Sequence, residues 1–289
     1  MTSMISGKSM DIGKVVLLGA SGRLGQILRT CWQNPSSLVS HSRHAQPGFV
    51  SFDVSHEPSK AAAVMQGAGA IICLSGVTPA QAAQTGNPFS LNAELARNAI
   101  RAAHKAGAGR VFLISTAAVY GRASGIQDEN TRCQPVSDYG RAKLEMETAA
   151  FTVSRELDHP VTILRIGNVA GADAILGGWR KGMLIDQLPN GTTPRRSYVG
   201  PETLTRVMQE LAQTSDLPDI LNIASPGAIE MGHLLNAANL KWSPRTAPDD
   251  VIETVELSTK QLERHIEFAP QNSTAVGMVA EWRRVKARK

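Results

Sequence analysis

Long apolar runs are missing from the chain, and so is an apolar segment near its N-terminus. A membrane-spanning helix needs about 20 consecutive apolar residues, and no stretch of the 289 residues approaches that length. Residues 1–10 are polar and lack the apolar core of a signal peptide, so we expect them to be disordered. These absences predict a cytoplasmic protein with no membrane partner.

Cysteines and aromatic residues are also scarce. The three cysteines, Cys31, Cys73 and Cys133, are odd in number and widely spaced, which predicts reduced thiols rather than a disulfide framework or a zinc site. The four tryptophans are spread along the chain, so no aromatic platform for single-stranded nucleic acid is expected.

Excess positive charge is missing from most of the chain, although the net charge is +5. Residues 283–289 carry five basic side chains and no acidic one, so the remainder of the chain is neutral. A neutral body does not form a groove for a phosphate backbone, and we expect no nucleic-acid partner. The basic tail itself is predicted to be a frayed, solvated C-terminus.

A glycine-rich turn follows the first strand-like run. Residues 15–18 are apolar, and Gly19, Gly22 and Gly25 come next at three-residue intervals, before a helical pattern. Strand, glycine turn and helix in this order are typical of a dinucleotide-binding site, in which the helix N-terminus faces a pyrophosphate. The alternative is an ordinary glycine-rich turn. The predicted cofactor site here comprises Gly19, Ser21, Gly22, Arg23, Leu24 and Gly25.

The residues after the second predicted strand favour NADP over NAD. An acidic residue about 20 positions beyond the glycines holds the ribose 2′-hydroxyl of NAD, whereas an arginine suits the 2′-phosphate of NADP. Ser42 and Arg43 occupy this place, with no carboxylate nearby. Asp53, followed by Val54, is expected either to hold the adenine amine or to cap the next helix.

Two further apolar strands end in small polar residues. Residues 69–74 run into Ser75, Gly76 and Thr78, and residues 110–114 run into Ser115 and Thr116. Because open α/β sheets hold ligands at the carboxyl ends of their strands, we place cofactor contacts at Leu74, Ser75 and Gly76. Asn92, near the start of a predicted helix over 91–106, is either a structural amide that binds backbone or part of the site.

Tyr139 and Lys143 lie one turn apart on a helix that Ser137 is predicted to cap. An ammonium close to a phenol stabilises the phenolate and lowers its pKa, so Tyr139 is the predicted acid/base. A Tyr-x-x-x-Lys spacing alone is weak evidence, because both residues are common on solvated helix surfaces. The strands and the glycine turn upstream supply the supporting context.

Four motifs together resemble the extended short-chain dehydrogenases/reductases, the NAD(P)-dependent epimerase/dehydratase family. They are GASGRLG at 19–25, STAAVYG at 115–121, YGRAK at 139–143 and LRIGNVAG at 164–171. The resemblance implies that Thr116, Tyr139 and Lys143 are catalytic, and that Lys143 also binds the nicotinamide ribose. It further implies that Ile166 and Gly167 pass the nicotinamide, while Thr78, Thr116, Asn168 and Arg195 contact substrate.

The resemblance also implies the architecture. We expect an α/β, Rossmann-type, doubly wound parallel sheet over residues 11–165, with 195–225 returning to it. Residues 166–194 and 226–289 are expected to form a small substrate-binding lobe. A homodimer is expected through the helices at 91–106 and 139–153.

The implied activity is hydride transfer between NADP(H), or NAD(H), and a hydroxyl or carbonyl carbon of a sugar or sugar nucleotide. Sugar-nucleotide 4,6-dehydratases carry an Asp-Glu pair directly after the catalytic Thr, and Ala117 and Ala118 stand there instead. Dehydration is therefore not expected. The alternatives are an NADPH-dependent reductase of a small non-sugar carbonyl compound and a catalytically silent, NADP-binding regulatory protein.

Overall fold

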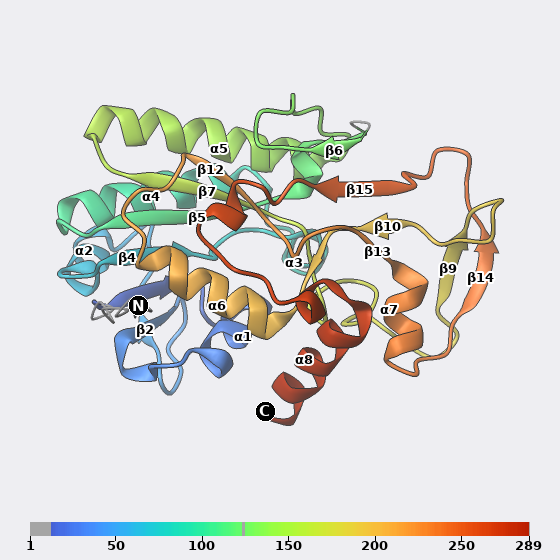
Figure 1. Ribbon diagram of the computed structural model, residues 1–289. Coiled ribbons are helices and arrows are strands. Elements are labelled where there is room, and N and C mark those ends of the chain that lie inside the picture. The colour runs from blue at the N-terminus through green and yellow to red at the C-terminus, as the bar shows by residue number, and fades with distance from the viewer. Residues whose placement is uncertain (1–12, 123–124, 289) are drawn as a thin grey trace, which may run out of the picture.

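A seven-stranded parallel sheet forms the centre of the computed structural model, which describes residues 13–122 and 125–288 (Figure 1). The predicted disorder of residues 1–10 concerns residues outside this description. The strand order is β12-β7-β5-β4-β1-β2-β3, so the chain winds outward in both directions from its first strand. The strands are β1 (Val15–Leu18), β2 (Leu38–Ser42), β3 (Val50–Ser51), β4 (Ala70–Cys73), β5 (Arg110–Thr116), β7 (Val161–Ile166) and β12 (Ile220–Ile223).

Helices cover both faces of this sheet (Figure 1). One face carries α2 (Pro58–Met65), α4 (Leu91–Lys105) and α5 (Asp138–Leu157), and the other carries α1 (Arg23–Cys31) and α6 (Pro201–Ala212). This arrangement confirms the predicted Rossmann-type α/β fold. None of the described helices combines the length and the apolar character that crossing a membrane requires.

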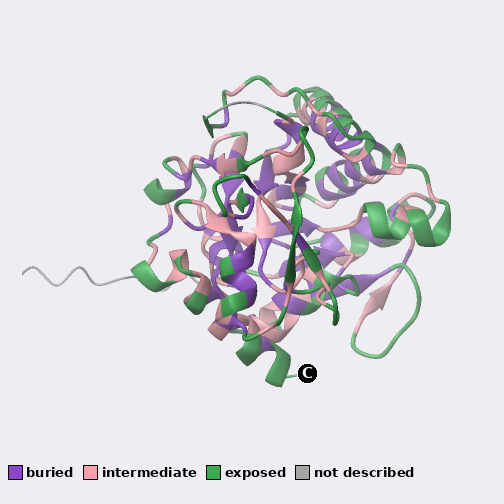
Figure 2. Cartoon of the chain, turned by 90° about the vertical axis from the view of Figure 1, so that its right-hand side faces the viewer, coloured by how far each residue is buried: buried purple, intermediate pink, exposed green. Residues whose placement is uncertain are grey.

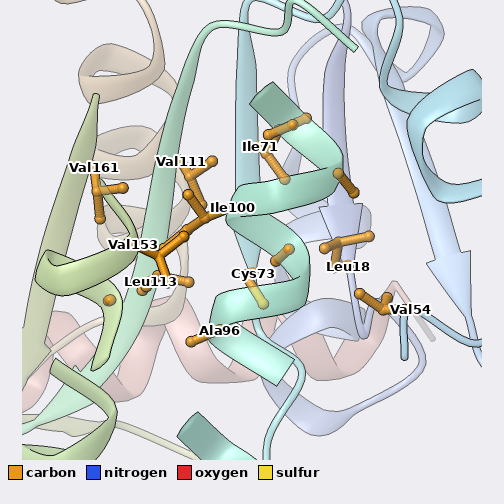
Figure 3. Packing of buried hydrophobic residues seen from close by; sticks show 14 of the residues in the cluster. Leu18, Val54, Ile71, Cys73, Ala96, Ile100, Val111, Leu113, Val153 and Val161 are labelled. Carbon is orange, nitrogen blue, oxygen red and sulfur yellow. The ribbon is translucent and has the colours of Figure 1, made fainter. Parts of the chain in front are cut away.

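Strands β1 and β4 are apolar throughout because each is buried on both sides. Alternate residues enter opposite cores: Val16 and Leu18 pack under α4 and its neighbours, while Val15 and Leu17 pack against α1 and α6. Figure 3 shows the first of these cores, in which Ile100 of α4 lies against residues of the strands. Buried residues are concentrated in the sheet and on the inner faces of the helices (Figure 2).

A smaller lobe lies beyond the carboxyl ends of the strands (Figure 1). Its largest sheet has the order β13-β10-β15-β6, and two further strand pairs, β11–β8 and β14–β9, accompany it. The lobe strands are β6 (Ile126–Gln127), β8 (Asn168–Val169), β9 (Leu184–Gln187), β10 (Arg195–Arg196), β11 (Tyr198–Val199), β13 (Ile229–Glu230), β14 (Ser243–Thr246) and β15 (Thr254–Leu257). The remaining helices are α3 (Pro79–Thr85), α7 (Met231–Ala237), α8 (Ala275–Ala287) and short 3₁₀ turns at Pro35–Ser37, Ala117–Val119, Leu262–Arg264 and Pro270–Ser273.

The boundaries between sheet and lobe differ from those predicted. The segment 195–225 was expected to return to the main sheet, but β10 pairs with β13 and β15 in the lobe, and only α6 and β12 return. Residues 126–127, expected within the nucleotide-binding domain, form β6 at the edge of the lobe sheet. These strands are only two residues long and pair with segments far away along the chain, so no local sequence pattern predicts them.

The basic tail is ordered as far as Arg288, the last described residue, which corrects the prediction of a frayed C-terminus. The Nη2 atoms of Arg284 in α8 and of Arg288, which follows this helix, lie 2.6 and 2.9 Å from the carboxylate of Glu202 on α6. The Arg283 guanidinium donates to the carbonyl oxygen of Ala238 at 2.9 Å. The basic side chains that were predicted to be solvated therefore bind α8 to Glu202 of α6 and to the carbonyl oxygen of Ala238.

Candidate active site

Two adjoining cavities open at the carboxyl ends of β1, β2, β4, β5 and β7. The first has a volume of about 500 Å³ and the second about 770 Å³. Gly19, Gly22, Leu74 and Gln81 line both, so the cavities form one continuous groove. Most of the predicted site residues line it: Gly19, Ser21, Gly22, Arg23, Leu24, Gly25, Ser42, Arg43, Asp53, Val54, Leu74, Ser75, Gly76, Thr78, Thr116, Tyr139, Ile166, Gly167 and Asn168.

The glycine turn between β1 and α1 forms the floor where the cavities meet. Gly19 has φ +73°, and a Cβ there would lie 2.8 Å from the backbone nitrogen of Ser75. A Cβ on Gly25 would overlap the backbone of Ala20. Both positions therefore require glycine, and the turn leaves its backbone open to a ligand, as a pyrophosphate-binding turn does.

His41 is a member of the first cavity that the sequence interpretation missed. Its imidazole is buried in β2, with Nδ1 3.2 Å from the backbone nitrogen of Gly19 and Nε2 2.8 Å from the carbonyl oxygen of Phe52. Burial lowers the pKa of His41, with Asp53 and the Phe52 carbonyl acting in the opposite direction. A histidine within a short strand carries no motif, so only the contact with Gly19 identifies it.

The side chains of Ser42 and Asp53 already have local partners. Ser42 Oγ accepts from Gln46 Nε2 at 2.7 Å. Asp53 Oδ1 accepts from the backbone nitrogen of Ser55 at 2.8 Å, and its contacts with Ser55 and His56 lower the pKa of Asp53 against the effect of burial. Asp53 therefore stabilises a turn through its own side chain. This resembles the predicted capping role, but the N-cap residue of α2 is Glu57.

The second cavity brings together Thr116, Tyr139 and Asn168, which come from β5, α5 and β8. Thr116 ends β5, and its Oγ1 accepts from the backbone nitrogen of Ala118 at 3.2 Å. Tyr139 lies in the first turn of α5, where the Ser137 hydroxyl caps the helix at Gly140, as predicted. The Tyr139 ring packs against Phe89 with centroids 5.8 Å apart.

Lys143 is buried and lines neither cavity. Its Nζ lies 3.2 Å from Met146 Sδ, and burial lowers the pKa of Lys143 to about 8. The pKa of Tyr139 is raised by burial, which is opposite to the lowering that the Tyr-x-x-x-Lys spacing led us to expect. Helical spacing places the two residues on one face, but the direction of the lysine side chain depends on packing around it.

Asn92 and Arg195 also lie outside both cavities. Asn92 Oδ1 accepts from the backbone nitrogen of Val77 at 2.9 Å, and Nδ2 donates to the carbonyl oxygens of Val77 and Phe89. Asn92 is thus the structural amide, one of the two roles considered from the sequence. Arg195 lies on β10 and donates to the carbonyl oxygen of Ala228 at 3.0 Å, so its predicted place in the substrate site is not reproduced.

The two cavities differ in charge. The charged or titratable side chains lining the first, among the described residues, are His41, Arg43, His44, Asp53, His56 and Glu94. Those lining the second are Arg23, Tyr139 and Asp173. Asp173, which belongs to no sequence motif, accepts from the backbone of the 171–177 loop and from the Tyr198 hydroxyl. Its carboxylate therefore fixes one wall of the second cavity.

The fold and the glycine turn define a Rossmann-type nucleotide-binding protein. The model of the NAD dependent epimerase/dehydratase family matches residues 15–188, and the chain belongs to that family. The resemblance inferred from the four motifs is therefore confirmed. No curated protein sequence is significantly similar to the chain.

Solved structures share the fold at low sequence identity. MoeE5, in complex with UDP-glucuronic acid and NAD, is 20% identical, with a TM-score of 0.73 over 94% of this chain and 99% of that one. UDP-glucuronic acid 4-epimerase from Bacillus cereus is 16% identical, with a TM-score of 0.75 over 96% and 100% of the two chains. The dTDP-glucose 4,6-dehydratase DesIV from Streptomyces venezuelae is 17% identical, with a TM-score of 0.72 over 95% and 98%.

Proposed function

We propose that the protein is an NAD(P)-dependent oxidoreductase or epimerase that acts on a hydroxyl or carbonyl carbon of a sugar or sugar-nucleotide-like substrate. The observation that carries the proposal is the position of Thr116, Tyr139 and Asn168 in a cavity continuous with the glycine turn. Family membership and the sugar nucleotides named for MoeE5 and the Bacillus cereus epimerase support the substrate class.

The residues of the groove fit a nicotinamide dinucleotide. Glycines at 19 and 25 let the turn pack closely on the backbones of Ser75 and Ala20, and the turn lies at the start of α1, where backbone N–H groups favour an anion. Arg43 is exposed beside the first cavity and, together with Ser42, suits the 2′-phosphate of NADP. We therefore assign NADP(H) as the preferred cofactor, with the adenosine half in the first cavity.

When bound, the nicotinamide supplies the hydride acceptor or donor. Tyr139, with its raised pKa, holds a protonated phenol at neutral pH, which is the form that donates a proton to an oxygen gaining negative charge. Thr116 presents a hydroxyl to the same cavity and is assigned to hydrogen-bond the reacting oxygen. Lys143 is assigned to the ribose contact, because its Nζ lies 3.8 Å from the place of a Cβ on Gly76, which lines the first cavity.

Loss of water from the substrate is not proposed, although DesIV is a dehydratase. A dehydration needs an acid and a base beside the leaving hydroxyl. Ala117 and Ala118 follow Thr116 in a 3₁₀ turn and carry only methyl groups. Neither of the charged residues that line the second cavity replaces them, because Asp173 is held by backbone donors and Arg23 donates to the Ala172 carbonyl.

The sparse charge of the second cavity favours a second candidate function, the NADPH-dependent reduction of a small carbonyl compound. A nucleoside diphosphate carries charges that proteins usually meet with several cations. Arg23 is the single described cation that lines this cavity, and it adjoins the glycine turn. A small carbonyl compound without a diphosphate would need no further cation.

Mass spectrometry of the small molecules released by denaturing fresh protein tests the proposal, followed by turnover on panels of sugars, sugar nucleotides and carbonyl compounds. Tightly retained cofactor with substrate isomerisation indicates an epimerase, whereas empty protein that oxidises NADPH indicates a reductase. We expect Tyr139→Phe to lower kcat about 10²- to 10⁴-fold while cofactor still binds. Near-normal turnover by this variant refutes the mechanism. Bound NADP with no turnover on any panel favours the catalytically silent alternative.

A further inference from the structure

We propose that His41 is a positioning residue of the cofactor site, whose neutral imidazole holds the glycine turn by accepting a hydrogen bond from Gly19. The inference rests on the proposed function, because it concerns the part of the groove assigned to the dinucleotide. Neither the glycine motif nor the Tyr-x-x-x-Lys motif includes this residue.

The hydrogen-bond partners of His41 fix its protonation state. The backbone nitrogen of Gly19 can only donate, and the carbonyl oxygen of Phe52 can only accept. Nδ1 must therefore be the acceptor, at 3.2 Å from Gly19, and Nε2 must carry the hydrogen, at 2.8 Å from Phe52. A protonated imidazole would place an N–H group against the N–H group of Gly19.

The same imidazole joins three segments that form the first cavity. It belongs to β2, contacts the turn that follows β1, and lies against the Phe52 ring after β3 with ring centroids 4.0 Å apart. Only 2% of its surface is exposed. Gly19 has a positive φ and packs closely on Ser75. Because glycine has more backbone freedom than any other residue, loss of the hydrogen bond from Gly19 would let the turn leave this conformation.

The surroundings keep His41 neutral near neutral pH. Burial lowers its pKa from the ordinary 6.5 and outweighs the opposing effects of Asp53 and the Phe52 carbonyl. The other titratable groups lining this cavity are Arg43 and His44 after β2, His56 after β3, and Glu94 of α4. As the pH falls through the lowered pKa of His41, the bond to Gly19 is lost, and the affinity for a dinucleotide should fall with it.

Two substitutions separate the two hydrogen bonds. The amide oxygen of asparagine can occupy the place of Nδ1, so His41→Asn keeps an acceptor for Gly19 that does not titrate. The amide nitrogen of glutamine can occupy the place of Nε2, so His41→Gln keeps the donor to Phe52 and removes the acceptor for Gly19. His159→Asn is the matched control, because His159 is also a buried histidine with a pKa lowered by burial, but it lines neither cavity.

The experiment is calorimetric titration of each protein with NADP⁺ and with NAD⁺ from about pH 4.5 to about pH 8.5, a range that extends well below the ordinary pKa of histidine because the pKa of His41 is lowered. Comparison between variants removes the titration of the nucleotide itself. We expect the affinity of the wild type and of His159→Asn to fall at least about threefold more than that of His41→Asn towards low pH. His41→Gln should bind at least about tenfold more weakly than His41→Asn at pH 8, a loss that corresponds to one hydrogen bond.

An equal pH dependence in the wild type and His41→Asn overturns this proposal and leaves the proposed function intact. No binding of either nucleotide by the wild type overturns both. Nitrogen NMR of the wild type gives a readout that needs no variant, because it distinguishes the two imidazole tautomers. We expect hydrogen on Nε2 at neutral pH, and hydrogen on Nδ1 would overturn the proposal.

Discussion

Arg165 of β7 and Glu147 of α5 form an ion pair inside the protein, with Nη2 and Oε2 2.7 Å apart and side-chain exposures of 5% and 2%. The same carboxylate accepts a hydrogen bond from the Ser115 hydroxyl, directly before Thr116 on β5. The Arg165 guanidinium also donates to the Tyr120 hydroxyl at 3.1 Å. This pair therefore holds α5, which carries Tyr139 and Lys143, against β5 and β7.

Removing one charge of this pair should be costly. We expect Glu147→Gln to lower the free energy of unfolding by about 3 to 5 kcal/mol, because Arg165 is left as a buried charge without its partner. Urea denaturation measures the loss. Glu156→Gln, an exposed change on the same helix, is the control and should alter stability by less than about 0.5 kcal/mol. The double variant Glu147→Leu/Arg165→Met should lose less than Glu147→Gln, and a larger loss would contradict this account.

Replacing Lys143 should stabilise the protein while abolishing activity. Burial lowers the pKa of Lys143 from 10.5 to about 8, so the folded state binds its proton less tightly than the unfolded state. Above about pH 10.5 the lysine is neutral in both states and does not lower the free energy of unfolding. As the pH falls from about 10.5 through about 8, the unfolded state gains the proton first, and this stability is lost. Lys143→Met removes the penalty, and we expect a gain on the order of 1 to 3 kcal/mol at pH 7.

Thermal and urea unfolding of Lys143→Met across this pH range provide the measurement. The slope of stability against pH between about 8 and 10 should flatten relative to the wild type. The exposed Lys105→Met change on α4 is the control and should leave the slope unaltered. A loss of stability at pH 7 in Lys143→Met would show that another group already compensates the buried ammonium.

Cofactor preference should depend on Arg43. We expect Arg43→Ala to weaken NADP(H) binding by about 10- to 100-fold and NAD(H) binding by much less, since one charge-assisted contact to a phosphate contributes about 1.5 to 3 kcal/mol. Fluorescence titration with NADPH and NADH measures both affinities. Arg132→Ala, an exposed change outside both cavities, should alter neither. Equal weakening of the two dinucleotides would refute the assignment of Arg43 to the 2′-phosphate.

The attachment of α8 should depend more on Glu281 than on Glu202. Glu281 is buried and accepts from the backbone nitrogens of Glu202 and Thr203, at 3.0 and 2.9 Å, at the first turn of α6. We expect Glu281→Ala to cost about 2 to 3 kcal/mol, because it leaves buried donors unsatisfied. The ion pairs of Glu202 are partly exposed, so Glu202→Ala should cost about 1 kcal/mol or less by urea denaturation. The reverse order would contradict the capping role.

Homodimerisation through the outer surfaces of α4 and α5 remains a prediction. Light scattering should give twice the chain mass of 30.9 kDa. Thr148→Arg places a bulky charge on an exposed position of α5 and should shift the mass towards the monomer. Gln33→Arg, beyond α1 on the opposite side of the sheet, should not. A monomeric wild type, or equal masses for the two variants, would reject this interface.

The sequence by itself determined the features that depend on neighbouring residues. The apolar runs at β1, β4 and β5 need burial on both faces, and Gly19 and Gly25 need backbone space, so the nucleotide-binding half could be recognised without a structure. Thr116 could be placed in the site because the carboxyl ends of parallel strands meet at one edge of the sheet, whereas Tyr139 was placed there by the helical Tyr-x-x-x-Lys motif and its family resemblance.

Only the tertiary structure decided the features that depend on residues far apart in the chain. His41 acts on a glycine that precedes it by 22 positions, and Arg284 reaches Glu202 across 82 positions, so neither contact leaves a local pattern. Arg195 lies outside both cavities because β10 takes its partners from β13 and β15. The pKa of Tyr139 was predicted in the wrong direction because helical spacing fixes where side chains start, whereas burial and rotamer decide which charges they meet.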